Sequence, residues 1–257
     1  SVPTRWRNSI KRPGDTVRVG KKFDERRQEK MPTEAALDAL PKVYRLATEP
    51  VDVLVSSVAA ILCSAPDRIN EALILPDLCE VHQSAGSGKA EAYGLRWWPA
   101  KGADPMVKWI VPSMASVVEE AIGKIRSVTH EARQIAKWYE DHPGKIYLHE
   151  GAEHLRDVEW LMMSDVASII GVANAASAVS WCTSRKLELN GRGASKMVRF
   201  VDIETVVISM LPAGFPFLEK ETGLRYCDAL LVVRTKELNP QKGTCCCMIE
   251  PISIRST

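Results

Sequence analysis

The stretch from residue 113 to residue 142 constrains the fold more than any other part of this 257-residue chain. Its spacing predicts one long amphipathic helix, and Pro143-Gly144 predicts where that helix ends. We expect the helix to be a scaffold on which other segments pack. The apolar side chains with helical spacing are Val117, Val118, Ala121, Ile122, Ile125, Ala132, Ile135, Ala136 and Tyr139.

Composition sets the broad class. With 46% hydrophobic residues the chain can bury a sizeable core, and we expect one domain accompanied by a smaller module. Because no apolar run approaches 18 residues and SVPTRWRNSIKRPG lacks a signal-peptide core, we expect a cytoplasmic protein without a membrane partner.

Seven cysteines without a C-x-x-C pair or zinc-ligand spacing predict reduced thiols, no metal and no cofactor. For Cys245-Cys246-Cys247 we favour thiols packed beside a strand over redox or metal chemistry.

Residues 1–31 are strongly basic. Ten Lys and Arg side chains against four Asp and Glu give residues 1–30 a net charge of +6. Pro3, Pro13, Gly14 and Gly20 interrupt helices, so this segment predicts an extended arm. It either lies along a polyanion or is a solvated linker. The side chains expected to contact DNA there are Arg5, Arg7, Lys11, Arg12, Arg18, Lys21 and Lys22.

Residues 32–73 predict three helices. The first is PTEAALDALPKVYRLAT, which we expect to start near Pro32 or Thr33. The second, VDVLVSSVAAILC, is apolar nearly all round, so we expect it to be central. The third has Pro66 in its first turn. On the third helix Arg68 and Glu71 share a face, in otherwise apolar surroundings. Burying an unpaired guanidinium costs on the order of several kcal/mol. Arg68 therefore either pairs with Glu71 or faces a cleft that receives an anion.

The next segment carries candidate lysines. EAYGLRWWPAKGADPMVKWIVP predicts a β-hairpin, because its apolar stretches flank the turn formers of KGADP. Lys101 lies at the predicted tip, where it can reach a ligand. Lys108 lies on the outgoing strand and is the second candidate. The segment before the hairpin, LPDLCEV, is an acidic, strand-like link.

In order and spacing, APDRINEAL, LPDL and PAKGADPMVKWIVP resemble the first half of the catalytic domain of tyrosine recombinases, the phage-integrase family. The resemblance covers roughly residues 32–125. It implies that Arg68 contacts the scissile phosphate, that Glu71 supports the site and that Lys101 protonates the leaving 5′-oxygen. A guanidinium can hold two phosphate oxygens at once, and a lysine on a hairpin can donate a proton, so the chemistry agrees with these roles.

The resemblance further implies DNA recombination or integration through a 3′-phosphotyrosine, with double-stranded DNA as partner. It also implies self-association of the full-length protein on DNA, and association with the nucleoid. Two family features are missing, because HEAR (residues 130–133) lies in the scaffold and none of the five tyrosines lies in a suitable late helix. We therefore expect the front part of an integrase, inactive alone. The alternative is a non-catalytic DNA-binding or protein-interaction module that retains the recombinase fold.

Residues 155–211 predict a second unit. We expect a first helix that Ser164-Asp165 caps and Gly171 ends, and a second helix over residues 176–185. A hairpin, LEL-NGRGASK-MVRF, follows, and Asp202 caps a third helix. This order resembles the winged helix-turn-helix modules of excisionase and MerR type. The alternative is an insert used for packing or protein contacts, because the second helix carries few base-reading side chains. The implied DNA contacts are Ser177 and Arg185 on that helix and Arg192, Lys196 and Arg199 in the wing.

The expected fold is mainly α with small β-hairpins, an α+β class: a recombinase-like catalytic half with a small winged-helix module. We divide the chain into a basic arm (1–31), the N-terminal part of the catalytic domain (32–150) and the winged-helix insert (151–215). A return segment toward the rest of the catalytic domain follows (216–257), with ALLVVR as its one convincing strand. GSGK (86–89) lacks the glycine pattern and context of a P-loop or Rossmann enzyme.

Overall fold

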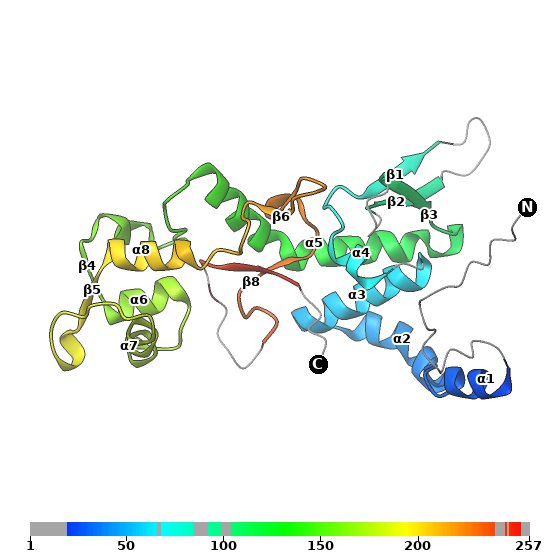
Figure 1. Ribbon diagram of the computed structural model, residues 1–257, viewed down its shortest axis with the longest axis horizontal. Coiled ribbons are helices and arrows are strands. Elements are labelled where there is room, and N and C mark those ends of the chain that lie inside the picture. Colours follow the sequence, from blue (N-terminus) through cyan, green and yellow to red (C-terminus); the bar gives the residue numbers. More distant parts are fainter. Residues whose placement is uncertain are drawn as a thin grey trace, which may run out of the picture. The chain divides into compact units, whose positions relative to one another are not determined.

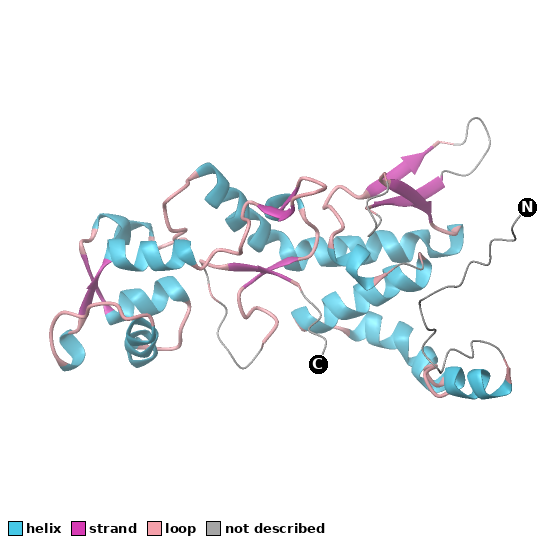
Figure 2. Ribbon diagram, in the orientation of Figure 1, coloured by secondary structure: helices cyan, strands magenta, loops and turns pink. Residues whose placement is uncertain are grey.

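The computed structural model describes residues 20–65, 68–84, 92–98, 104–239, 245 and 247–252. Its contacts separate two compact units, residues 1–45 and residues 46–257. Helices predominate, and the strands form small two- and three-stranded sheets (Figures 1 and 2). The predicted α+β class is confirmed. The four-part division of the chain stays a prediction.

Residues 1–45 contain α1 (Lys21–Gln28) and all but the last residue of α2 (Glu34–Leu46). The predicted extended arm is wrong for residues 21–28, because KKFDERRQ holds no Gly or Pro and forms a helix directly after Gly20. Lys21 and Lys22 are exposed on α1. Residues 1–19, with five of the predicted DNA contacts, lie outside the described residues. The Thr33 hydroxyl accepts the N–H of Ala36, which confirms the predicted start of α2.

The scaffold of residues 46–257 is a pair of packed helices, α3 (Pro50–Ser64) and α5 (Pro112–Asp141). As predicted, α5 ends just before Pro143-Gly144. The predicted apolar side of α5 is buried from Val118 to Tyr139, and Val117 is half-buried. In the sequence, α3 is followed by the short helix α4 (Ile69–Leu73), which starts later than predicted. Arg68 is its N-cap, with extended backbone, and is not part of the helix.

A three-stranded antiparallel sheet follows α4, in the order β1 (Glu80–Gln83), β2 (Ala92–Trp97) and β3 (Met106–Trp109). The pairing of β2 with β3 confirms the predicted hairpin. Gly94 on β2 is required by packing, because a Cβ there would lie 2.8 Å from the carbonyl oxygen of Lys108. Lys101, at the predicted tip, lies outside the described residues.

The next module contains α6 (Met163–Ile170), α7 (Ala175–Ser184) and α8 (Phe200–Ser209). As predicted, Gly171 ends α6 in the left-handed region. Asp165 accepts the N–H of Met162 from within the first turn of α6 and is not the N-cap itself. Asp202 likewise lies in the first turn of α8, which begins after Arg199. A short 3-10 helix, Glu153–Asp157, precedes the module.

The predicted wing hairpin forms only in part. Asn190 and Met197 close the predicted loop by one antiparallel bridge around the 3-10 turn Gly193–Ser195, and the pairing goes no further. On its other side β5 (Met197–Arg199) pairs with β4 (Trp160–Met162). This pairing places Leu161 beside Val198, and both are fully buried, whereas Leu187 and Leu189 remain partly exposed.

The last described segments complete two cores. Strands β6 (Phe217–Glu219) and β7 (Leu224–Arg225) pair, as do β8 (Val232–Arg234) and β9 (Ile249–Pro251), and the 3-10 helix Tyr226–Asp228 lies between them. A strand was predicted over the apolar run 229–234, and β8 covers only its second half. Cys245 and Cys247 are buried just before β9, with sulfurs 3.7 Å apart, in the core formed by α6, α7 and α8. The second core joins the end of α5 to residues 224–232.

We expect Leu161→Ala to lower the free energy of unfolding by about 2–5 kcal/mol, because it empties a fully buried position between β4 and β5. Urea unfolding followed by circular dichroism measures this change. Its neighbour Met162 is 50% exposed on the same strand, so Met162→Ala is the control, with an expected loss of less than about 0.5 kcal/mol. Equal losses in the two variants would contradict the packing described here.

Candidate functional site

Arg68 and Glu71 form an ion pair at the start of α4. Arg68 Nη1 donates to Glu71 Oε1 at 3.1 Å, and the Arg68 backbone N–H donates to Oε2 at 3.3 Å. The Arg68 side chain is 65% exposed and that of Glu71 only 7%. The expectation of a buried arginine is therefore wrong, and the buried partner is the glutamate. An N-cap residue lies at the surface end of its helix, from which the longer side chain extends into water while the carboxylate folds back on the backbone.

Lys108 joins this pair from β3. Its Nζ lies 4.0 Å from Glu71 Oε2 and 5.2 Å from the centre of the Trp97 ring. Burial lowers the pKa of Lys108, because the ammonium is partly removed from water. A lysine with a lowered pKa gives up its proton more readily than an exposed one. The structure thus brings together Arg68, Glu71 and Lys108, the lysine that the sequence ranked second.

The charges of this cluster suit an oxyanion. Two cations share one carboxylate, and one of the two is an exposed guanidinium. Glu71 holds Arg68 from the buried side, so most of the guanidinium faces water. A planar guanidinium fixed in this way can bind two oxygens of a phosphate, and Lys108 can contribute a second charge.

A second network fixes the link between α4 and β1. Arg126 on α5 donates through Nε to Asp77 Oδ1 at 3.1 Å, and through Nη1 to Glu80 Oε2. Tyr93 donates to the other oxygen of Glu80 at 2.8 Å. Burial and this bond raise the pKa of Tyr93, because both favour the neutral phenol. These side chains satisfy one another's hydrogen-bonding groups, so we interpret the network as structural. The acidic residues of LPDLCEV were its only signal in the sequence.

His130 and Arg133 have the spacing of an H-x-x-R box, but both residues lie on the scaffold helix α5. Arg133 is 8% exposed, donates to Thr129 Oγ1 and lies 3.4 Å from Asp77 Oδ1. The two residues line a polar cavity of about 290 Å³ together with Lys137 and others. The guanidinium is therefore engaged inside the scaffold, in agreement with the sequence-based placement of HEAR.

The predicted DNA contacts of the second module lie on α7 and around β5. Ser177 is in the first turn of α7, where its N–H donates to Asn174 Oδ1 at 2.9 Å. Arg185 stacks on the Trp181 ring at 4.1 Å, and Arg199 makes two hydrogen bonds to Asp202. Arg185 and Arg199 are thus held by local partners. Arg192 is exposed and Lys196 half-buried, on different elements from those that carry Arg68, Glu71 and Lys108.

Within the residues that the structure describes, no three His, Cys, Asp or Glu side chains gather as metal ligands. In the same ranges no single helix is long and apolar enough to cross a membrane, although α6 and α7, bent by 79°, reach that length and composition together. The chain matches no family model, no curated protein and no solved structure. The geometry of the site is therefore the basis for assigning a function.

The lowered pKa of Lys108 has a consequence for stability. Between the lowered pKa of Lys108 in the folded chain and its ordinary pKa of about 10.5, the unfolded chain binds more protons than the folded one. The contribution of Lys108 to stability therefore rises with pH in this range. We expect the free energy of unfolding of wild type minus that of Lys108→Met to increase as pH rises toward about 10.5. Urea unfolding at a series of pH values measures it. A difference that stays constant or falls would show that Lys108 is not desolvated.

Proposed function

We propose that this chain binds duplex DNA through its phosphates, as the front part of a tyrosine recombinase. One observation carries the proposal: the exposed guanidinium of Arg68 is anchored on the buried carboxylate of Glu71, with Lys108 at the same carboxylate. A surface arginine with no ligand gains little from being fixed in place. A fixed guanidinium beside a second cation does suit the bidentate binding of a phosphate.

In this proposal each residue has a role in strand breakage and rejoining. Arg68 holds the non-bridging oxygens of the scissile phosphate, and Glu71 positions Arg68. Lys101 remains the proposed proton donor to the leaving 5′-oxygen, as the resemblance to integrases implies. Lys108 is proposed to add positive charge at the phosphate, because it contacts the same carboxylate as Arg68.

The finer fold is part of the same proposal: a recombinase-like catalytic half and a winged-helix-like insert that adds DNA contacts. The three helices of the insert and the exposed Arg192 support it. The loop around residue 192, closed by the Asn190–Met197 bridge, takes the place of a full wing hairpin. The proposal implies a cytoplasmic, nucleoid-associated protein that self-associates on DNA in its full-length form.

A non-catalytic DNA-binding or protein-interaction module is the second candidate. The engagement of Arg133 by Thr129 and Asp77 favours it, because this arginine is then not free to hold a phosphate. The recombinase and a DNA-binding module both require the Arg68 site to bind DNA, whereas a protein-interaction module does not. The recombinase and the DNA-binding module differ in whether the full-length protein forms a phosphotyrosine.

We expect Arg68→Ala to weaken binding to a labelled DNA duplex by about tenfold or more, because a charged hydrogen bond to phosphate is lost. The plot of log affinity against log salt concentration should become shallower by about one unit. Fluorescence anisotropy at several salt concentrations measures both changes.

Arg225→Ala is a matched control for that experiment. Arg225 is 48% exposed and pairs at 3.1 Å with Glu140, whose side chain is 8% exposed, so the pair closely resembles Arg68–Glu71. It should leave DNA binding unchanged. The proposal fails if Arg68→Ala binds like wild type, or if both variants lose the same affinity.

We also expect this chain alone to form no covalent bond to DNA. All five tyrosines lie in the described residues, and Tyr93 and Tyr139 donate to Glu80 and to the carbonyl of Cys247. Burial raises the pKa of both phenols and of Tyr226, which makes them poor nucleophiles. A suicide substrate with a nick near the scissile phosphate, run on a denaturing gel, tests this. A covalent protein–DNA band would overturn the expectation and identify the tyrosine.

A further inference from the structure

The sheet of β1, β2 and β3 (Figure 1) has one face toward the core and one outer face. Successive side chains of a strand point to opposite faces of its sheet. On β2 every second side chain from Tyr93 to Trp97 is buried in the core, so Gly94 and Arg96 lie on the outer face. The pairing of β2 with β3 places Trp109 directly opposite Gly94 on that face. Trp109 is 47% exposed, so the outer face presents a large aromatic side chain to water.

Gly94 supports the indole ring of Trp109. A Cβ at position 94 would lie 2.9 Å from Cε3 of Trp109, so the six-membered part of the ring covers bare backbone. The same Cβ would lie 2.9 Å from Cγ1 of Val107, the next outer-face side chain on β3. The ring is therefore held against the sheet on one side and reaches water on the other. Such a ring is a platform on which another flat ring can stack.

Arg96 provides a positive charge beside this platform. It lies diagonally across from Trp109 in the pairing of β2 with β3, and such neighbours are about 7–8 Å apart, within reach of a long side chain. Arg96 is exposed, and within the described ranges its guanidinium has no ion pair or hydrogen-bond partner. The outer-face positions of β1, β2 and β3, over the residues that form these strands, hold no Asp or Glu. The charge of Arg96 is thus not neutralised on this face.

We propose that this face binds an unpaired nucleotide of DNA, with its base stacked on Trp109 and its phosphate paired with Arg96. The proposal rests on the proposed function in that DNA is the ligand. Every base has a flat π-face, so an exposed indole binds unpaired bases without reading their sequence. A guanidinium without a protein partner suits the neighbouring phosphate. The apolar ring and the cation thus match the two parts of a nucleotide.

This site takes a different form of DNA from the site at Arg68. In a duplex the bases are stacked on one another and paired, so their faces are not available to Trp109. Arg68 requires only the phosphates, which a duplex presents on its surface. The outer face of the sheet therefore recognises single-stranded DNA.

Two labelled single strands of equal length and charge test the base contact on the full chain. One consists of deoxyuridines, and the other carries an abasic site at every position. We expect the deoxyuridine strand to bind at least about tenfold more tightly, because stacking of one base on an aromatic side chain is worth about this factor. Fluorescence anisotropy gives both dissociation constants. Equal affinities for the two strands overturn the proposal.

Variants assign the preference for bases to this face. Trp109→Leu keeps an apolar side chain over Gly94 but removes the ring, so it should bind the two strands equally, whereas Trp109→Phe should retain most of the preference. Because Trp109 is 47% exposed, the fold should tolerate both changes. A preference that survives Trp109→Leu places the base elsewhere and overturns the proposal.

Arg96→Gln tests the phosphate contact. It should weaken both strands severalfold and keep the ratio of their affinities. The plot of log affinity against log salt concentration should become shallower by about 0.7, the value for one phosphate of a single strand. Unchanged affinity and slope overturn the pairing of Arg96 with phosphate.

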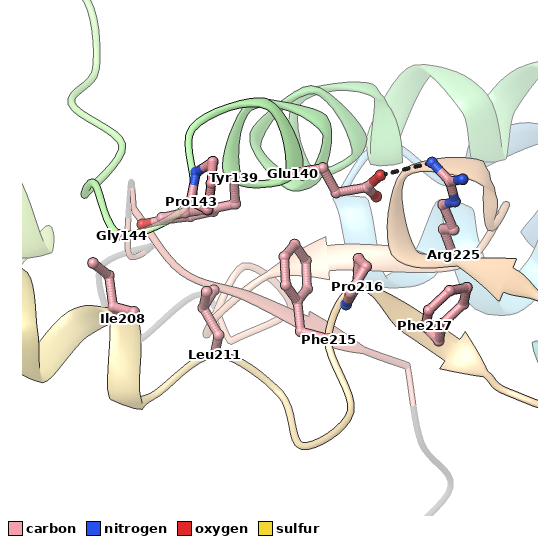
Figure 3. Close-up of a pocket in the computed structure, with 10 residues that line it drawn as sticks. All are labelled: Tyr139, Glu140, Pro143, Gly144, Ile208, Leu211, Phe215, Pro216, Phe217 and Arg225. Atoms are coloured by element: carbon pink, nitrogen blue, oxygen red, sulfur yellow. Dashed lines mark hydrogen bonds and ion pairs between the residues drawn. The ribbon is translucent and has the colours of Figure 1, made fainter.

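Phe217 is the matched control, because it too is an exposed aromatic residue beside an arginine. It is 37% exposed on β6 and lies directly opposite Arg225 of β7. Figure 3 shows Phe217 in the wall of an apolar cavity of about 470 Å³, with Arg225 paired to Glu140 at 3.1 Å. This arginine is already neutralised, so Phe217→Ala should leave the affinities for both strands unchanged. Loss of the preference in this variant as well as in Trp109→Leu overturns the assignment to Trp109.

Other ligands of an aromatic platform are distinguished in the same titrations. Proline-rich protein segments also dock on aromatic surfaces. Binding of hexaproline more tightly than the deoxyuridine strand, if lost in Trp109→Leu, would assign the face to a protein partner and overturn the proposal. Tighter binding of the matching RNA strand of uridines would overturn the assignment to DNA.

Duplex binding separates this inference from the proposed function. Trp109→Leu should leave the affinity for a duplex unchanged, while Arg68→Ala weakens it. If Arg68→Ala leaves duplex binding unchanged but the preference for deoxyuridine still depends on Trp109, the duplex site fails and the nucleotide site stands. If duplex binding depends on Arg68 but the two single strands bind equally, this inference alone is overturned.

Discussion

Burial of one side of α5 holds together segments from both ends of residues 46–257. α3 covers part of the helix, and β8, β9 and the 3-10 helix at 226–228 cover another part. Removing these apolar surfaces from water is the main favourable contribution to folding. The same helix carries Arg126 and Arg133, which reach Asp77 and so fix the segment between α4 and β1. The position of Glu71 relative to β3, and with it the Arg68 cluster, therefore depends on α5.

Features that depend on local spacing could be predicted from the sequence. The apolar positions of α5, its end before Pro143-Gly144, the hairpin of β2 and β3, and Gly171 as the end of α6 each follow from residues close together in the chain. Local spacing also predicted that Arg68 and Glu71 lie close together, although Arg68 caps the helix and does not share one of its faces. It could not predict which of the two is buried, because that depends on segments packed over the start of α4.

Features that depend on distant segments could not be predicted. Lys108 reaches Glu71 only because β3 pairs with β2 beside α4, and Arg225 reaches Glu140 across a long separation in sequence. The supposed wing shows the same limit: the local hairpin is reduced to one bridge, and the pairing of β5 with the distant β4, which buries Leu161 and Val198 together, was not predicted. Glu140 carried no such signal, because its partner Arg225 lies 85 positions later in the chain.

The positions of Cys245, Cys247 and Met248 determine when one core of the chain can be completed during synthesis. Cys245, Cys247 and Met248 belong to the core that otherwise spans residues 146–207, and the hydroxyl of Tyr139 donates to the carbonyl of Cys247 at 2.7 Å. A ribosome adds residues from the N-terminus onward, so this core stays open until residue 248 has left the exit tunnel. During that interval its apolar side chains face water or a chaperone. The helices of the module are thus made early and acquire their final packing late.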